Sequence, residues 1–169
     1  MDVFEAMQKR RSVRKFTDQK VEDEKVQTIL HSAMSGPSAC NRRPWEFYVV
    51  TNEVLLEQIK KASRFSNFNS PMVIIVAGNL HHALPLQLSE YWVQDCSAAV
   101  ENILLSATAL GLGSVWCGLK PQKRPMDRVR AILGIPDYIE PLALIHVGYP
   151  AQESIPRDQY EESKLHYFK

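Results

Sequence analysis

Positively charged side chains concentrate near the start of the chain, in the run KRRSVRKF at residues 9–16. Five of these eight residues are Lys or Arg, although the whole chain of 169 residues has a formal net charge of only +1. Arg10, Arg11 and Arg14 fall within two helical turns, with the hydroxyl of Ser12 between them, and guanidinium groups bind phosphate oxygens in pairs. The cluster therefore fits a compact dianion, and a solvated basic surface is the alternative interpretation.

Other phosphate and nucleic-acid signals are absent. Twenty basic residues against 19 acidic ones do not provide the excess charge that a nucleic-acid surface needs. Gly111 and Gly113 follow a helical pattern and lack the third glycine of a dinucleotide motif, and no P-loop sequence occurs. The three cysteines are widely spaced and indicate neither a disulfide framework nor a zinc site. If the chain binds a phosphate, side chains must provide most of the contacts, because no glycine-rich backbone loop is available.

A second polar segment, GPSACNRRPWEFYVV at residues 36–50, joins a helical pattern to a strand pattern. Gly36 and Pro37 stop the helix, so Ser38 and Asn41 are expected on a loop before Pro44. An ordinary helix-to-strand connection explains this segment as well as a binding loop does.

Hydrophobic periodicity predicts alternating elements. MVIIVAG at 72–78 is apolar at every residue, which is typical of a central strand buried on both faces. Helices are expected over 2–11, 22–35, a stretch containing Leu55, Leu56 and Ile59, 87–110 and 126–133; strands are expected over 46–51, 72–78, 114–117 and 142–148. This alternation favours an α/β or α+β sandwich.

The longest predicted helix, 87–110, and the tail point to a partner. Apolar side chains cover most of the circumference of 87–110, so that helix should run through the core or a subunit interface. Residues 149–169 are polar and have no core face, so they are expected to be disordered or packed on something else. No composition break occurs before the tail, and no apolar run approaches a membrane span or signal peptide, so we expect one cytoplasmic domain, 1–169.

Four motifs in order resemble the nitroreductase family of flavin mononucleotide (FMN) enzymes. They are R-R-S-x-R-x-F at 10–16, P-S-x-x-N-x-x-P-W at 37–45, QDCSAAVENILLSATALGLGSVWCG at 94–118, and HVGYP with the tail RDQYEESKLHY. The resemblance implies an α+β fold, a three-layer α/β/α sandwich whose central sheet is mixed but mainly antiparallel. It also implies a homodimer in which each carboxy-terminal arm, 149–169, wraps the other subunit.

The resemblance also implies roles for individual residues. Arg10 and Ser12 would hold the FMN phosphate, while Arg14 would face the N1 and C2 carbonyl edge of the ring, with Arg11 at the ring edge or ribityl chain. Pro37, Ser38 and Asn41 would form one side of the slot for the ring. Trp116, Cys117 and Gly118 would form the loop that contacts N5. One cation of the tail, Arg157 or Lys164, would reach the phosphate. No side chain is expected to be catalytic and no metal is expected, because the flavin performs the redox chemistry.

The function implied is an FMN-dependent oxidoreductase with a ping-pong mechanism. NADH or NADPH would donate a hydride, and a small acceptor such as a nitroaromatic or quinone would then take its place. The short connections at 62–72 and 80–88 leave no room for an inserted lid, which predicts a shallow, permissive site. Relatives that remove halogen or fragment flavin, and a non-catalytic flavin binder, are the alternatives.

Overall fold

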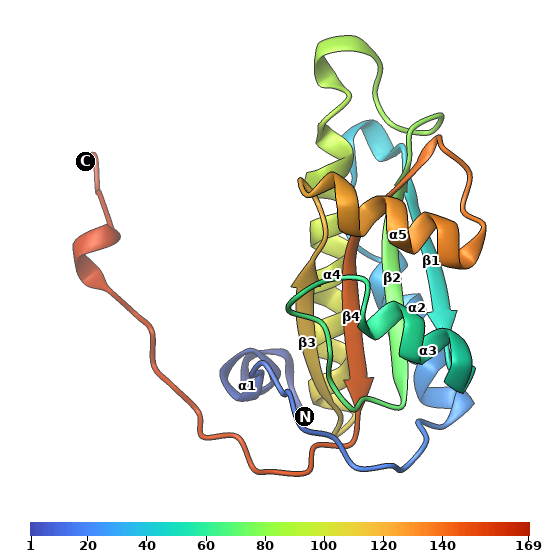
Figure 1. Cartoon of the computed structure of the whole chain (residues 1–169). Coiled ribbons are helices and arrows are strands. Elements are labelled where there is room, and N and C mark those ends of the chain that lie inside the picture. Colours follow the sequence, from blue (N-terminus) through green and yellow to red (C-terminus); the bar gives the residue numbers. More distant parts are fainter.

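The computed structural model describes residues 1–169, and its centre is the strand β2 (Met72–Asn79), in which every residue is buried. Figure 1 shows helices on both faces of the sheet that contains β2. The other main elements are α1 (Val3–Lys9), α2 (Asp23–Met34), β1 (Trp45–Val50), α3 (Glu53–Lys60), α4 (Tyr91–Ala109), β3 (Gly113–Gly118), α5 (Lys123–Leu133) and β4 (Ile139–Gly148). The expected α+β, three-layer α/β/α sandwich is confirmed.

The sheet has four strands in the order β1-β2-β4-β3. All neighbouring strands pair antiparallel, so the mainly antiparallel character is as predicted. The parallel component is a single isolated bridge between Ser12 and Ser114, outside the named pairs. In this order β3 is an edge strand, with one side of its backbone left for the amino-terminal segment and for solvent.

Strand alternation divides the apolar side chains into two cores. Met72, Ile74 and Val76 of β2 pack with α2 and α4 on one face, among residues such as Ile29 and Ile103. On the other face, the intervening residues of β2 pack with α3 and α5, through Val73, Ile75, Ala77, Leu56, Ile59, Met126 and Val129. A strand with two apolar faces is therefore required by this three-layer arrangement.

Two helix starts differ from the sequence prediction. The long helix begins at Tyr91 instead of residue 87, because Leu86 has a left-handed φ of 57° and Leu86–Leu88 form a separate 3₁₀ turn. Helix α5 begins at Lys123, three residues before the predicted start, with Pro125 in its first turn, where proline is well tolerated. No helix of the chain combines the length and apolar character that crossing a membrane requires.

The carboxy-terminal segment leaves the body of the molecule (Figure 1). Every residue from 151 to 169 is exposed, and the only regular element there is a 3₁₀ turn at Glu162–Lys164. The side chains of Ile155 and Phe168 are 83% and 99% exposed. The tail therefore leaves most of its apolar surface uncovered by its own chain.

Candidate functional site

A hollow of about 460 Å³ opens beside the edge strand β3. Its lining consists of Arg14, Arg64, Phe65, Asn67, Phe68, Val115, Trp116, Cys117 and Gly118, and we call it the edge hollow. It brings together four residues that the sequence analysis assigned to a flavin, Arg14, Trp116, Cys117 and Gly118, although about 100 residues separate the first from the rest. Arg14 and Arg64 are its only charged residues, so the hollow is positive.

The amino-terminal segment is placed by a contact with the edge of β3. The backbone N–H of Val13 donates to the Ser114 carbonyl at 2.9 Å, beside the Ser12–Ser114 bridge. Gly113 permits this approach, since a β-carbon there would lie 2.8 Å from the Val13 side chain. The segment then continues to Phe16, whose N–H and carbonyl both bond the side chain of Asn69. These contacts direct Arg14 into the edge hollow.

Beyond Ser114 the outer edge of β3 is open. Backbone groups of alternate residues in a strand point to the same side, so those of Trp116 and Gly118 face the side on which Ser114 accepts from Val13. A β-carbon built on Gly118 would have no atom within 4 Å. The structure therefore presents exposed backbone groups and an uncovered glycine at the position where the sequence analysis expected the flavin N5 contact.

The other basic residues of the first motif have different surroundings. Arg10 is half-buried and lies 3.8 Å from the Glu101 carboxylate of α4, an ion pair long enough to be exchanged for a ligand. Arg11 donates to the carbonyls of Ile155 and Arg157, at 3.1 and 2.9 Å, and also to the carbonyl of Arg10. The Arg11 guanidinium thus holds the start of the tail, whereas the Arg10 guanidinium makes only the long contact with Glu101.

The tail cations lie away from the edge hollow. Arg157 is exposed and contributes its carbonyl to Arg11. Lys164 is exposed and forms an ion pair with Glu161 at 2.7 Å. Neither residue lines the edge hollow of its own chain.

The Cys117 side chain is buried. Burial raises the pKa of its thiol to about 11, and the nearby Arg14 charge lowers that pKa only in part. The thiol donates to the Phe65 carbonyl at 3.5 Å, which joins β3 to the loop between α3 and β2. A protonated, hydrogen-bonded thiol is a poor nucleophile, so the backbone of Cys117 is the more useful part of this residue.

The second predicted segment forms a tight turn of unusual backbone geometry. Cys40, Asn41 and Arg43 all have a left-handed φ near 50°, which costs free energy for residues with side chains. Ser38 stabilises the turn, since its hydroxyl accepts from the Arg43 N–H at 3.0 Å. We call residues 37–43 the Ser38 loop.

The Ser38 loop is anchored to α4. The carboxylate of Asp95, only 6% exposed, accepts the Ala39 N–H at 2.8 Å. Arg42 donates to the carbonyls of His82 and Ala83, at 2.9 and 3.2 Å. The Asn41 side chain is exposed and takes part in none of these hydrogen bonds.

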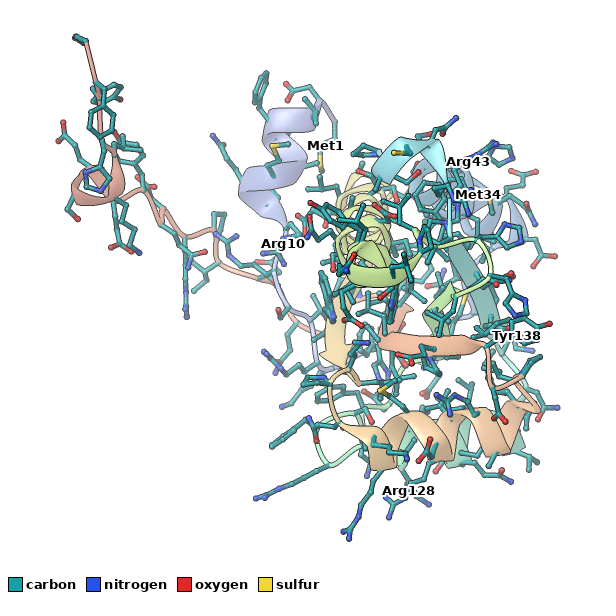
Figure 2. The ribbon with its side chains drawn as sticks, turned by 90° about the horizontal axis from the view of Figure 1, so that it is seen from above. Met1, Arg10, Met34, Arg43, Arg128 and Tyr138 are labelled. Atoms are coloured by element: carbon teal, nitrogen blue, oxygen red, sulfur yellow. The ribbon has the colours of Figure 1, made fainter.

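One copy of the chain does not bring the Ser38 loop to the edge hollow. Pro37, Ser38 and Asn41 are absent from the lining of the edge hollow. Figure 2 places Arg10 and Arg43 on opposite sides of α4. The basic segment and the Ser38 loop are therefore separate features of the subunit surface.

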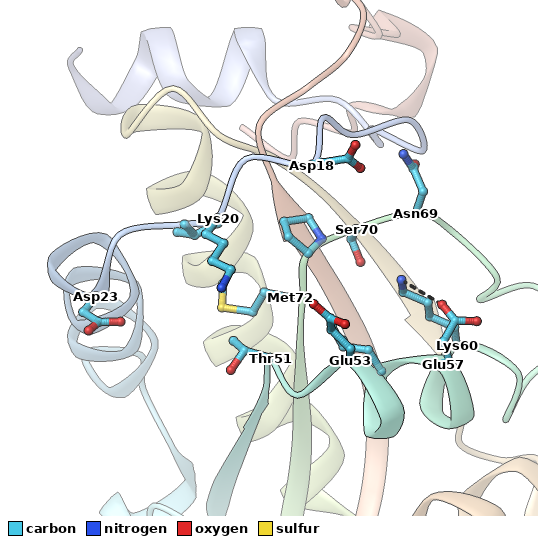
Figure 3. A pocket seen from close by; sticks show the side chains of 13 residues that line it. Asp18, Lys20, Asp23, Thr51, Glu53, Glu57, Lys60, Asn69, Ser70 and Met72 are labelled. Carbon is cyan, nitrogen blue, oxygen red and sulfur yellow. Dashed lines mark ion pairs between the residues drawn. The ribbon is translucent and has the colours of Figure 1, made fainter.

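A second and larger hollow, of about 570 Å³, contains none of the predicted residues. It lies near the start of β2 and the end of β1, and Figure 3 shows the Lys60–Glu57 ion pair within it. Four carboxylates and two lysines line it, Asp18, Asp23, Glu53, Glu57, Lys20 and Lys60. A net negative lining disfavours a phosphate, so the smaller edge hollow is the better site for a phosphorylated ligand.

Sequence reasoning missed four residues of the edge hollow, Arg64, Phe65, Asn67 and Phe68. All four come from the loop between α3 and β2, where no periodicity indicated a structural role. The exposure of Phe65, 66%, next to an unpaired arginine is the kind of signal that only a structure provides.

The chain belongs to the nitroreductase family: the family profile matches residues 7–72 and 63–149. It is 40% identical, over its full length and 88% of the relative, to a protein of Methanothermobacter thermautotrophicus provisionally named NADH dehydrogenase/NAD(P)H nitroreductase.

Solved structures agree with this assignment. A protein of Parabacteroides distasonis with the same provisional name superimposes with a TM-score of 0.92 at 36% identity, covering 98% of this chain and 96% of that one. A provisionally named nitroreductase from Desulfovibrio desulfuricans, in complex with FMN, superimposes with a TM-score of 0.83 at 26% identity. The match covers 100% of this chain and 98% of that one. The protein is accordingly an oxidoreductase.

Proposed function

We propose that the protein is an FMN-dependent oxidoreductase that takes a hydride from NADH or NADPH and reduces a small acceptor, such as a nitroaromatic or a quinone, in a ping-pong cycle. The observation that carries this proposal is the edge hollow, where Arg14 meets the open backbone of Trp116 and Gly118. The FMN complex of the Desulfovibrio desulfuricans relative supports the same cofactor.

The residues present fit FMN. An uncovered glycine beside exposed backbone groups accommodates a flat ring, and a backbone N–H can donate to its N5 atom. In this arrangement Arg14 stabilises the negative charge that develops at the N1 and C2 carbonyl edge. Arg10 and Ser12 would hold the phosphate, with Arg10 exchanging its long contact with Glu101 for the phosphate oxygens.

The electron balance needs no acid or base from the protein. FMN supplies a ring that accepts two electrons and passes them on. NAD(P)H gives up a hydride and becomes NAD(P)⁺; a nitro group takes two electrons and two protons, yielding a nitroso group and water, with the second proton drawn from solvent. The chain contributes position and charge: the open edge fixes the ring, and the arginines favour the reduced state.

A second copy of the chain completes the site in this proposal. The Ser38 loop, with Pro37, Ser38 and Asn41, would close the edge hollow of the other subunit. Residues 149–169 would form an exchanged arm that brings Arg157 or Lys164 toward the partner's phosphate. Exposed apolar side chains on α1 and the tail support such an interface, including Phe4 at 73% and Ile155 at 83% exposure.

Arginine variants test the cofactor assignment. Arg10→Ala and Arg14→Ala each remove a charged donor, which corresponds to roughly a tenfold or larger rise in the FMN dissociation constant. Arg128→Ala is the control, since Arg128 is exposed on α5 (Figure 2) and does not line the edge hollow. The visible spectrum and oxidation of NAD(P)H with menadione or nitrofurazone are measured in parallel. FMN occupancy equal in all three variants would refute the proposal, and FMN binding without turnover would leave only a flavin-binding role.

A further inference from the structure

The edge hollow contains one more cation than the flavin assignment uses. Arg14 is assigned to the ring edge, whereas Arg64, an exposed residue that lines the same hollow, forms no ion pair and no hydrogen bond within the chain. No Asp or Glu lines the hollow, so nothing within it neutralises the Arg64 charge. An unpaired guanidinium in a cavity without carboxylates favours an anionic ligand.

The Arg64 guanidinium lies over an exposed aromatic ring. Its guanidinium carbon lies 5.4 Å from the centre of the Phe65 ring, within the range of a cation–π contact. Phe65 is 66% exposed, and Trp116, which lines the same hollow, is 37% exposed. The rim thus combines apolar ring faces with one free positive charge.

The loop that carries this pair is anchored at several points. The buried hydroxyl of Ser66 donates to the carbonyls of Lys60 and Ser63, at 2.9 and 3.1 Å. The Phe65 carbonyl accepts from the Cys117 thiol, and Asn69 forms two hydrogen bonds with the backbone of Phe16. Arg64 and Phe65 are therefore held at the rim by bonds on both sides of them.

We propose that Arg64 and Phe65 select aromatic acceptors that carry a carboxylate, such as a nitrobenzoate, over neutral aromatics of the same shape. This inference rests on the proposed function, because it takes the flavin ring to lie on the open edge of β3. An acceptor that stacks over that ring brings its substituent to the rim, where the Arg64 fork binds a carboxylate in a bidentate manner. The 2′-phosphate of NADPH is a poorer candidate, because two riboses and a pyrophosphate separate it from the nicotinamide ring.

The test compares Arg64→Gln with the parent protein and with Arg128→Gln, a control that removes an exposed arginine from α5. Calorimetric titration with benzoate and with benzamide measures the preference for charge without any turnover. We expect the parent and the control to prefer benzoate by about fivefold to tenfold, and Arg64→Gln to lose that preference with benzamide affinity unchanged. The ratio of kcat/KM for 4-nitrobenzoate to that for 4-nitrobenzamide should fall by a similar factor.

Three outcomes would overturn the inference. These are equal benzoate affinity in the parent and Arg64→Gln, a parallel loss for benzoate and benzamide, and a change confined to the KM for NADPH. Failure of the proposed function is distinguishable, since FMN content and menadione turnover are recorded on the same preparations. Absent FMN and turnover would remove the proposed function, whereas the benzoate titration would still decide whether the hollow prefers anions.

Discussion

Gly118 offers the sharpest test of where a ligand lies, because a side chain added there meets nothing in the protein. A β-carbon on Gly118 has no neighbouring atom within 4 Å, and Gly118 is not among the residues of positive φ. Gly118→Ala should therefore leave the free energy of unfolding unchanged or raise it by about 0.5 kcal/mol, since alanine restricts the unfolded chain.

The same methyl group would collide with a bound ring. Atoms in van der Waals contact are about 3.5–4.0 Å apart, so a ring seated on the Gly118 backbone leaves no space for a β-carbon. Forcing a methyl into a packed contact costs about 1–3 kcal/mol, which corresponds to a rise in the FMN dissociation constant of roughly 5-fold to 150-fold. Binding should fall while the fold stays intact.

Gly78→Ala is the matched control, with the opposite expected result. A β-carbon on Gly78 would lie 2.2 Å from the Trp92 ring, and Gly78 does not line the edge hollow. That variant should lose about 2 kcal/mol or more of stability and keep the FMN affinity of its folded fraction. Urea unfolding and flavin-fluorescence titration measure the two quantities. An FMN dissociation constant for Gly118→Ala within twofold of the parent value would refute the proposed position of the ring.

Three other perturbations test the surroundings of the site. Asp95→Ala removes the acceptor of the Ala39 N–H and should raise the FMN dissociation constant about fivefold or more. Asn102→Ala is the control, since it removes a hydrogen bond from the same helix to the Ser32 carbonyl and should leave the FMN dissociation constant unchanged. Equal effects of the two variants in a fluorescence titration would contradict this prediction. Burial lowers the pKa of His146 to about 4, so between pH 6.5 and pH 4 this histidine is protonated in the unfolded state and neutral in the folded state. The free energy of unfolding should then fall by about 2 kcal/mol between pH 7.5 and pH 5, and urea unfolding of His146→Gln should lack this loss. Deleting residues 151–169 should give a single chain by native mass spectrometry with reduced FMN content, and a truncated dimer that retains FMN would disprove the role of the arm.

Local sequence patterns predicted the scaffold well because each element follows from its own apolar spacing. The uninterrupted apolar run at 72–78 required two covered faces, and alternate residues of β2 do enter two different cores. The start of α4 was predicted four residues early, since the left-handed φ of Leu86 is a backbone property that hydrophobic spacing does not reveal. Errors of this kind fall at element ends and leave the topology unchanged.

The candidate site was predicted only in part, because its assembly depends on contacts between distant segments. The residue types in the KRRSVRKF run indicated anion binding, but only the Val13–Ser114 contact places Arg14 beside Gly118. Nothing in the sequence showed that Arg11 would bond the tail carbonyls, or that Arg64 would line the same hollow as Arg14. Side-chain bonds from Ser66 and Asn69 fix that loop, and such bonds have no periodic signature.

The open edge of β3 connects the stability of the fold with its chemistry. An exposed edge strand presents unpaired backbone groups that favour association with another strand, and proteins usually cover or charge such edges. Here the first half of the edge is covered by the segment at Ser12 and Val13, and the second half, Trp116 to Gly118, is flanked by two arginines. The arginines discourage pairing with a strand while attracting an anion, and the uncovered glycine admits a flat group. The backbone positions that leave the sheet incomplete are therefore the ones that the proposed FMN site uses, and covering them with a further strand would stabilise the sheet at the expense of that site.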